Sequence, residues 1–254
     1  MRLQGKVAMV TGAVGQLGRQ FCRALALEGA EVWVTDLDRQ RCQQVAEELP
    51  HRGASHHALA LDVGEPQSVQ EAMAEIKQVS AALDIVINNA GIAVFTPFEE
   101  RSFEDFMRVL RVNTGGTFLC IQQAAQLMRQ QGRGGSIINL GSIYGEVSSD
   151  PRIYTDCGRK NSECYSASKA GIIMMTRYFA VHLAPFGIRV NCISPGGIFN
   201  QQGEDFVGNY SRGVPMARMG QEEELNGAAV FLASDESRYM TGQNLIIDGG
   251  RLSW

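Results

Sequence analysis

The stretch that decides the fold is KVAMVTGAVGQLGRQF, residues 6–21. An apolar run ends at Thr11, and Gly12, Gly15 and Gly18 then follow at equal spacing before a helical pattern begins. A glycine turn between a strand and a helix can cradle the diphosphate of a dinucleotide, because it lets the backbone approach closely and aims the first helical N–H groups at the phosphates. The alternative is a tight strand–helix turn that holds no ligand.

The rest of the chain repeats this alternation of strand and helix. Seven short runs are apolar along their whole length, which is typical of strands covered on both faces. The patterns between them place apolar residues at three- and four-residue steps, as at Val69, Met73 and Ile76. Repeated βα units with right-handed crossovers form a parallel sheet. We therefore predict an α/β, doubly wound Rossmann-type fold, with a central parallel sheet of about seven strands flanked by helices on both faces.

The periodicity also predicts the bounds of these elements. Strands are expected at 6–11, 31–36, 56–63, 84–90, 135–142, 187–194 and 243–250, and helices at 16–30, 38–50, 66–83, 102–131 and 163–185. The last helix is expected to begin after Ser162 and to end at Pro185 and Gly187. Because no repeat, linker or low-complexity tract divides the chain, we expect a single domain over residues 1–254.

Composition and charge argue against several classes of function. The 254 residues are 44% hydrophobic and 20% charged, as in a globular protein with a core. A net charge of −4 gives no reason to expect nucleic acid or an anionic membrane as a partner. No apolar run approaches the roughly 20 residues of a membrane span, and the start shows no signal-peptide pattern, so we expect a cytoplasmic protein.

The six cysteines are scattered, with no C-x-x-C pair and no histidines at metal-ligating spacing. We therefore predict reduced thiols and no metal site. Only Cys157 and Cys164, which lie in a polar segment, are candidates for exposure.

Acidic residues end two of the predicted strands. Asp36 lies at about the distance from the glycine turn that a dinucleotide fingerprint requires. Its carboxylate can accept hydrogen bonds from both hydroxyls of the adenosine ribose and would repel a 2′-phosphate. Asp36 therefore favours NAD over NADP. Arg39 and Arg41 could reverse that preference, or they are solvated charges of a first helical turn. Asp62 could reach the adenine amino group or cap its own loop.

Three further features fall at the carboxyl edge of the predicted sheet, where open α/β folds bind ligands. Ser142 follows a strand, Tyr165 and Lys169 lie one turn apart on one face of a helix, and Asn113 lies within a long helix. Each has a plain structural explanation, such as a helix cap or a chance spacing. Their joint placement behind a dinucleotide turn favours a catalytic site.

These residue types suit the transfer of a hydride between an alcohol carbon and a nicotinamide. A tyrosine with a pKa near about 10 is a poor base at neutral pH unless its phenolate is stabilised. The ammonium of Lys169 and the positive charge of the oxidised nicotinamide would stabilise it, and Lys169 could also hold the nicotinamide ribose. Ser142 would hydrogen-bond the substrate oxygen as charge develops there.

From about Lys6 to Gly250 the sequence resembles a short-chain dehydrogenase/reductase of the single-domain type. The matching elements are TGAVGQLG, Asp36, LDV at 61–63, NNAG at 88–91, Asn113, Ser142, YSASK at 165–169, RVNCISPGG at 189–197 and DGG at 248–250. The resemblance implies an NAD(P)-dependent oxidoreductase with a catalytic triad of Ser142, Tyr165 and Lys169, assisted by Asn113. It also implies that NNAG supports the sheet near the cofactor and that the loop from Pro195 to Asn200 embraces the nicotinamide. The expected cofactor-binding residues are Gly12, Gly15, Gln16, Leu17, Gly18, Asp36, Asp62, Val63, Asn89, Ala90, Gly91, Tyr165, Lys169, Pro195, Gly196, Ile198 and Asn200.

Two single residues depart from the family pattern. Gln16 stands where single-domain members usually carry glycine. The resulting T-G-x-x-G-x-x-G spacing is more usual among longer relatives that process nucleotide sugars and need an additional C-terminal substrate region. Because Trp254 follows soon after the last predicted strand, we do not expect that region here. We expect Gly12 and Gly18 still to bind the diphosphate, with the Gln16 side chain directed outward. Asn200 stands where a threonine usually contacts the nicotinamide carboxamide, and asparagine can still donate and accept hydrogen bonds there.

Two segments are expected to shape the substrate pocket. An insertion at 146–164 separates Ser142 from Tyr165 and should wall the pocket. Its cations Arg152, Arg159 and Lys160 could meet an anionic substrate group, or they are neutralised by acidic neighbours. Residues 198–220 should form a substrate-covering lid, and their polar composition favours a polyhydroxylated substrate such as a sugar or polyol.

The sequence thus predicts an NAD(H)-dependent oxidoreductase that interconverts a secondary alcohol and a ketone on a polar small molecule. An epimerase or dehydratase that acts on an activated sugar and returns NAD unchanged is the alternative, and an NAD(H) sensor without turnover has no need for the triad. The resemblance also implies a homo-oligomer, a dimer or tetramer paired through the two long helices. Candidate apolar contacts are Val109, Val112, Phe118, Ile172, Met175 and Phe179, unless these simply face the sheet.

Overall fold

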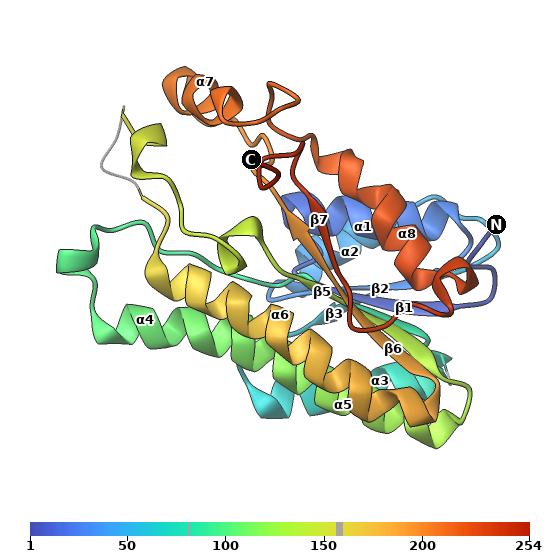
Figure 1. The fold of residues 1–254 in the computed structure, drawn as a ribbon. Helices are drawn as coiled ribbons and strands as arrows, with labels where there is room; N and C mark the ends of the chain where they lie inside the picture. Colours follow the sequence, from blue (N-terminus) through green and yellow to red (C-terminus); the bar gives the residue numbers. More distant parts are fainter. Residues whose placement is uncertain (81, 156–159) are drawn as a thin grey trace.

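The computed structural model describes residues 1–80, 82–155 and 160–254, and its centre is one parallel sheet (Figure 1). The strand order is β3-β2-β1-β4-β5-β6-β7, and every neighbouring pair is parallel. The strands are β1 Val7–Thr11, β2 Glu31–Asp36, β3 His56–Ala60, β4 Ile85–Asn88, β5 Gly135–Leu140, β6 Ile188–Pro195 and β7 Asn244–Ile247. The predicted doubly wound Rossmann-type fold is confirmed, and the order reverses between β1 and β4, where such folds open a crevice for ligands.

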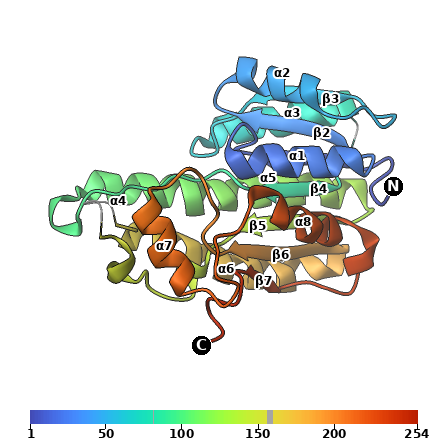
Figure 2. The same cartoon turned by 90° about the horizontal axis from the view of Figure 1, so that it is seen from above.

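Helices cover both faces of the sheet (Figures 1 and 2). One face carries α1 (Gln16–Leu27), α2 (Arg39–Glu48) and α8 (Asn226–Ala233), and the other carries α3 (Pro66–Ser80), α5 (Gly116–Gln131) and α6 (Glu163–Leu183). Beyond the carboxyl ends of the strands lie α4 (Phe103–Leu110) and α7 (Glu204–Arg212). Single 3-10 turns occur at Phe98–Glu100, Ile143–Gly145, Pro151–Ile153, Ala184–Phe186, Glu222–Leu225 and Asp235–Ser237.

Each face of the sheet buries its own hydrophobic cluster. On one face Phe21 and Leu25 of α1 are fully buried against the strands. On the other, Val69, Met73 and Ile76 of α3 pack in a cluster shared with α5. Burying a side chain of this size contributes about 1.5–3 kcal/mol, so the apolar stripes read from the sequence fix both helical layers.

The last strand ends before its predicted limit. β7 stops at Ile247, because Gly249 and Gly250 adopt positive φ and turn the chain away from the sheet. The carboxylate of Asp248 fixes this turn by accepting hydrogen bonds from the N–H groups of Gly250 and Leu252, both at 2.8 Å. The DGG motif therefore closes the sheet edge rather than extending it.

The helix predicted at 102–131 contains a break. A π-helical turn at Arg111–Gly115 separates α4 from α5. Turns of this kind are rare and frequently lie at functional sites, and this one contains Asn113. By contrast, α6 begins as predicted, because Ser162 caps it by accepting a hydrogen bond from the N–H of Tyr165.

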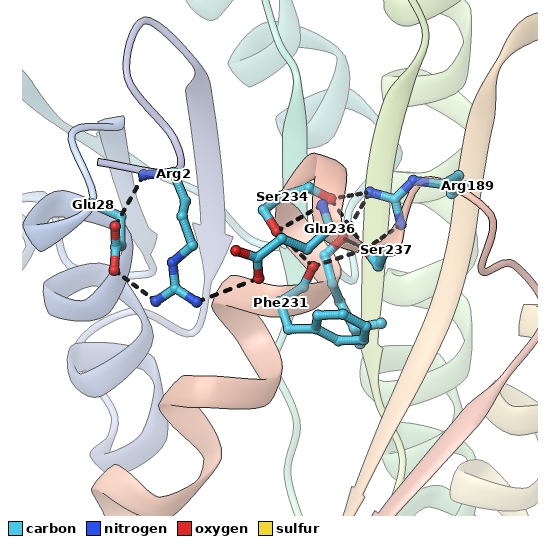
Figure 3. Close-up of polar contacts among 8 residues, drawn as sticks. Arg2, Glu28, Arg189, Phe231, Ser234, Glu236 and Ser237 are labelled. Atoms are coloured by element: carbon cyan, nitrogen blue, oxygen red, sulfur yellow. Dashed lines mark hydrogen bonds and ion pairs between the residues drawn. The ribbon is translucent and has the colours of Figure 1, made fainter.

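A polar network closes the amino-terminal edge of the sheet (Figure 3). The guanidinium of Arg189, at the start of β6, donates to the carbonyl oxygens of Leu232 at 2.8 Å and Ser234 at 3.2 Å, and to Ser237 Oγ at 2.9 Å. These carbonyls lie at the end of α8, where the helix dipole favours a cation. Burial lowers the pKa of Arg189.

Burial corrects three expectations. Val109 and Ile172, considered as subunit contacts, are 0% and 1% exposed and lie in the core, since they face inward from α4 and α6. Cys164 is also fully buried, in the same small cluster as Val109. Cys157 lies outside the described residues. Over the described ranges, none of the helices has the length and apolar character needed to cross a membrane.

Candidate active site

The glycine turn joins β1 to α1 at the switch point of the sheet. Gly12 has φ +63°, and a Cβ at this position would approach the backbone of Ala90 at 2.8 Å. A Cβ on Gly18 would overlap the backbone of Gly12. Gly15 is the N-cap of α1, and no side chain caps this helix. The first N–H groups of α1 therefore remain available to an anion, so this cradle fits the diphosphate of NAD(P).

The sequence predicts that the Gln16 side chain is directed outward, and this prediction is wrong. Its Nε2 donates to the carbonyl oxygen of Phe199 at 2.7 Å, in the segment that follows β6. Gln16 is the first residue of α1, so its side chain leaves the helix where that segment passes and bonds to the backbone in place of water.

The two acidic strand-end residues have different surroundings. Asp36 lies against the glycine turn, where its carboxylate accepts from the N–H of Val14 at 3.2 Å and of Leu37 at 2.8 Å. Asp62 instead caps its own loop by accepting from the N–H of Gly64 at 2.8 Å. Val63, beside it, is buried in the core under α5.

NNAG fastens β4 to the glycine turn. The Asn89 amide donates to the carbonyls of Thr11 and Gly12, both at 3.0 Å. The hydroxyl of Thr11 in turn accepts from the N–H groups of Asn89 and Ala90. Gly91 adds space, since a Cβ there would lie 3.3 Å from Asn113 Oδ1 and 3.8 Å from Lys169 Nζ.

Asn113 is fully buried and its amide is fully engaged. Its Oδ1 accepts from the N–H of Ile92 at 2.8 Å, and its Nδ2 donates to the Ile92 carbonyl and to Ser168 Oγ, both at 3.0 Å. The π turn presents this side chain between the segment after β4 and helix α6. The geometry suits a residue that positions α6 rather than one that touches a substrate.

Ser142, Tyr165 and Lys169 converge on one cavity of about 240 Å³. Its other lining residues are Leu17, Asn89, Gly91, Leu140, Gly141, Pro195, Gly196 and Ile198. Lys169 is 5% exposed, and its ammonium donates to the carbonyl of Leu140 at 2.7 Å. Its Nζ lies 5.5 Å from the centre of the Tyr165 ring. The structure thus brings the start of α1, the loop after β6 and the three residues of the predicted triad together.

Burial dominates the titration of these groups. It raises the pKa of Tyr165, and the Ser142 hydroxyl opposes that effect by hydrogen bonding to the phenol. Burial lowers the pKa of Lys169 from its ordinary value to about 8. Within the described residues no carboxylate pairs with this ammonium, so a phenolate or ribose oxygen in the cavity would stabilise its charge.

The expected insertion lies against the segment that carries α7. Ile153 is buried in a small cluster with Tyr210, and the ring of Tyr154 lies 5.4 Å from that of Phe206. Asn209 of α7 donates to Thr155 Oγ1 at 2.7 Å. These contacts join the two segments that were expected to wall and cover the pocket.

The cationic side chains of the insertion differ in their surroundings. Arg152 is 88% exposed in its side chain and pairs with Asp150 at 2.8 Å, which is the self-neutralised arrangement. Lys160 lines a larger cavity of about 1110 Å³ between the 96–101 segment, the 144–149 segment and the start of α6. Arg159 lies outside the described residues.

A cluster of tyrosines lies beside Ser142 and was not predicted from the sequence. Tyr144 interacts with Tyr154, and burial raises its pKa. The hydroxyl of Tyr210 accepts from the N–H of Gly197, in the loop after β6. Tyr144 is two residues from Ser142, which was the one available signal; the other contacts depend on tertiary packing. Among the described residues, no cluster of three His, Cys, Asp or Glu side chains could hold a metal ion.

Comparison with known proteins identifies the family. A family model described as enoyl-(acyl carrier protein) reductase matches residues 12–251. Three relatives are each 34% identical and are matched over 98% of this chain: sorbitol dehydrogenase of Cereibacter sphaeroides (98% of its length), D-threitol dehydrogenase of Mycolicibacterium smegmatis (94%) and 3-oxoacyl-(acyl-carrier-protein) reductase of Aquifex aeolicus (98%).

Solved structures agree. A short-chain dehydrogenase from Leptospira borgpetersenii with bound NAD+ is 40% identical, with a TM-score of 0.89 over 98% of this chain and 94% of its own. A gluconate 5-dehydrogenase from Burkholderia cenocepacia in complex with NADP and tartrate is 31% identical, with a TM-score of 0.91 over 100% and 97%. The chain belongs to the short-chain dehydrogenase/reductase family. It is an NAD(P)-dependent oxidoreductase that acts on CH–OH groups.

Proposed function

We propose that this enzyme interconverts a secondary alcohol and a ketone on a sugar, a polyol or a derivative of one, with NAD(H) as its cofactor. The observation that carries the proposal is the convergence of Ser142, Tyr165 and Lys169 on one cavity beside the uncapped glycine turn. The named relatives are dehydrogenases and reductases, which does not favour the NAD-retaining epimerase or dehydratase.

The chain's own groups supply the proton chemistry. When bound, the nicotinamide takes or gives the hydride. In the oxidative direction the Tyr165 phenolate removes the alcohol proton, and in reduction the phenol returns it to the carbonyl oxygen. The Lys169 ammonium lowers the cost of the phenolate, Ser142 donates to the substrate oxygen, and Asn113 holds the loop after β4 against α6.

The cofactor choice rests on Asp36. Its carboxylate is fixed at the end of β2 by the N–H groups of Val14 and Leu37, where it would accept from the ribose hydroxyls and repel a 2′-phosphate. Arg39 supports the same choice, because its guanidinium points toward Glu75 at 3.5 Å and is 65% exposed. The residues proposed to hold the rest of NAD are the glycine turn, NNAG and the loop from Pro195 to Asn200.

The substrate class rests on polar lining. The polar part of the larger cavity, next to Tyr144 and the start of α6, comes from Ser148, Ser149, Asn161 and Ser166; its apolar part comes from Pro97, Phe98, Val147, Ala167 and Ala170. Such polar groups can pair with successive hydroxyls of a polyol, whereas an acyl chain would leave them unpaired. We propose that residues 198–220 form the lid over this substrate and that 146–164 form its wall.

The test is a panel of polyols, aldoses, aldonates and 3-oxoacyl thioesters, each assayed with NAD(H) and NADP(H) by absorbance at the reduced nicotinamide band. We expect turnover with a polyol or sugar and NAD. Activity confined to the thioesters would contradict the substrate class. Conversion of an activated sugar without net NADH formation would indicate the alternative reaction.

We also propose that the chain forms a cytoplasmic homodimer or homotetramer. Apolar side chains of α4, α5 and α6 are exposed: Met107 45%, Phe118 39%, Met174 60% and Val181 71%. Large apolar side chains exposed on neighbouring helices are typical of a protein interface. The five described cysteines are free and buried, which suits a reducing compartment. Light scattering of the purified protein tests the assembly, and a monomer mass would contradict it.

A further inference from the structure

The Gln16 side chain joins two segments that border the candidate active site. Its bond to the Phe199 carbonyl crosses 183 positions of sequence. Gln16 begins α1 at the glycine turn, and Phe199 lies in the segment that leaves β6. This segment passes beside the first turn of α1 (Figures 1 and 2).

The bond lies at the rim of the catalytic cavity. The neighbours of its two partners, Leu17 and Ile198, both line the cavity that holds Tyr165 and Lys169. Leu17 places the first turn of α1 at one border of that cavity, and the loop after β6 forms another. The Gln16 amide therefore closes the gap between the two borders.

The backbone of Phe199, which accepts this bond, is held by further hydrogen bonds, whereas the donor is the single side chain of Gln16. The N–H of Phe199 donates to the Gly220 carbonyl at 2.8 Å, and the N–H of Gly220 donates to Gly197 at 2.9 Å. One turn further along α1, Gln20 donates to Glu222 Oε1 at 2.6 Å. Phe199, near the start of the 198–220 segment, and Glu222, just after its end, are thus each bonded to α1, and rotation of the Gln16 side chain opens the bond next to the cavity.

We propose that Gln16 is a clasp that retains the bound dinucleotide. This inference rests on the proposed function, because it places the diphosphate on the glycine turn and the nicotinamide under the loop after β6. A dinucleotide held by both must leave through the rim that the Gln16–Phe199 bond closes. Gln16 is a positioning residue, and it acts on cofactor release rather than on the transfer of the hydride or the proton.

The test is the rate of NADH release, measured by stopped-flow fluorescence while excess NAD+ displaces it from the full-length protein; NADPH replaces NADH if the protein binds only that form. Gln16→Met keeps the side-chain length without the donor, and Gln16→Gly installs the residue usual in the family. Gln43→Met, which removes an exposed glutamine of α2 bonded to Glu47, is the control. Because the dinucleotide crosses the same rim on entry and on exit, loss of one hydrogen bond should speed both release and association roughly five-fold in both Gln16 variants and leave the dissociation constant nearly unchanged.

The possible outcomes separate this inference from the proposed function. Release from Gln16→Met within a factor of two of the parent, or acceleration in Gln16→Gly alone, would overturn the clasp and leave the proposed function intact. A parent protein that binds neither NADH nor NADPH would overturn both.

Discussion

The two ends of the same parallel sheet are built differently. At the amino end the half-buried guanidinium of Arg189 has three acceptors, and Arg133 pairs with Asp84 at 2.8 Å (Figure 3 shows the Arg189 network). At the carboxyl end the buried ammonium of Lys169 has a carbonyl and, in the described part of the chain, no carboxylate. Helix α1 also starts there without a side-chain cap.

This difference separates stability from chemistry. Polar groups at the amino end are satisfied within the protein, so they hold the strands and α8 together. Those at the carboxyl end keep unused donors and an unbalanced charge, which costs stability and leaves them free for a cofactor and a substrate. Substitutions at the two ends should therefore have opposite effects on stability.

The largest effect on stability is expected for Arg189→Met. The change removes three hydrogen bonds from a charged donor, so the free energy of unfolding should fall by about 3 kcal/mol. The hydroxyls of Ser136 and Ser237 still donate to the carbonyls of Leu232 and Ser234. Urea unfolding measures it, with exposed Arg23→Met as the matched control. The turnover number should stay at the parental value. A loss below about 1 kcal/mol would show that this end does not carry the stability assigned to it.

Lys169→Met should have the opposite sign. The folded pKa of about 8 lies below the ordinary 10.5, so the charged lysine destabilises the fold below pH 8, and this cost disappears as pH rises from about 8 to 10.5. At pH 7 the variant should be about 2 kcal/mol more stable than the parent, after allowing for the lost bond to Leu140. The gain should shrink toward pH 10.5.

Thermal unfolding between pH 7 and 10 measures this effect, and turnover should be lost in the same variant. Lys77→Met, which removes an exposed lysine bonded to Gln130, should leave stability unchanged. A Lys169→Met protein that is less stable than the parent at pH 7 would contradict the claim that substitutions at the two ends of the sheet have opposite effects on stability.

The smallest effect is expected for Arg2→Met, at the outer margin of the amino end. Arg2 pairs with Glu28 at 2.6 Å and holds the pKa of that carboxyl below its usual range, but its side chain is 40% exposed. An exposed ion pair of this kind is worth about 0.5 kcal/mol and is screened by salt. Unfolding at low and high salt should show a small difference that salt removes. A loss as large as that of Arg189→Met would mean that the burial of a charged group does not determine how much it contributes to the free energy of unfolding.

The sequence predicted the layers of the fold well, because a parallel sheet marks its strands with continuous apolar runs and its helices with a 3.6-residue period. It left the partners of some polar side chains open. Asp62 was open between adenine and its own loop, and its carboxylate accepts from Gly64. Asn113, in the π turn, accepts a hydrogen bond from Ile92, and no local pattern encodes that partner.

The site shows the same division. Ser142, Tyr165 and Lys169 could be named from spacing, since a one-turn separation and a strand end fix where side chains meet. The bond of Gln16 to Phe199 and the contact of Tyr154 with Phe206 join residues far apart in the chain. Their partners follow from tertiary packing and not from any motif.

The most direct test of proton transfer by Tyr165 is the Tyr165→Phe variant, with turnover and NADH affinity measured on the same preparation. Removing the hydroxyl takes away the proton carrier and leaves the glycine turn and the loop after β6 untouched, so turnover should fall by at least about 1000-fold while the dissociation constant for NADH changes less than about two-fold. Tyr178→Phe, at a tyrosine of α6 that is 54% exposed, is the matched control. A Tyr165→Phe enzyme that turns over near the parental rate would contradict the proposed acid–base role.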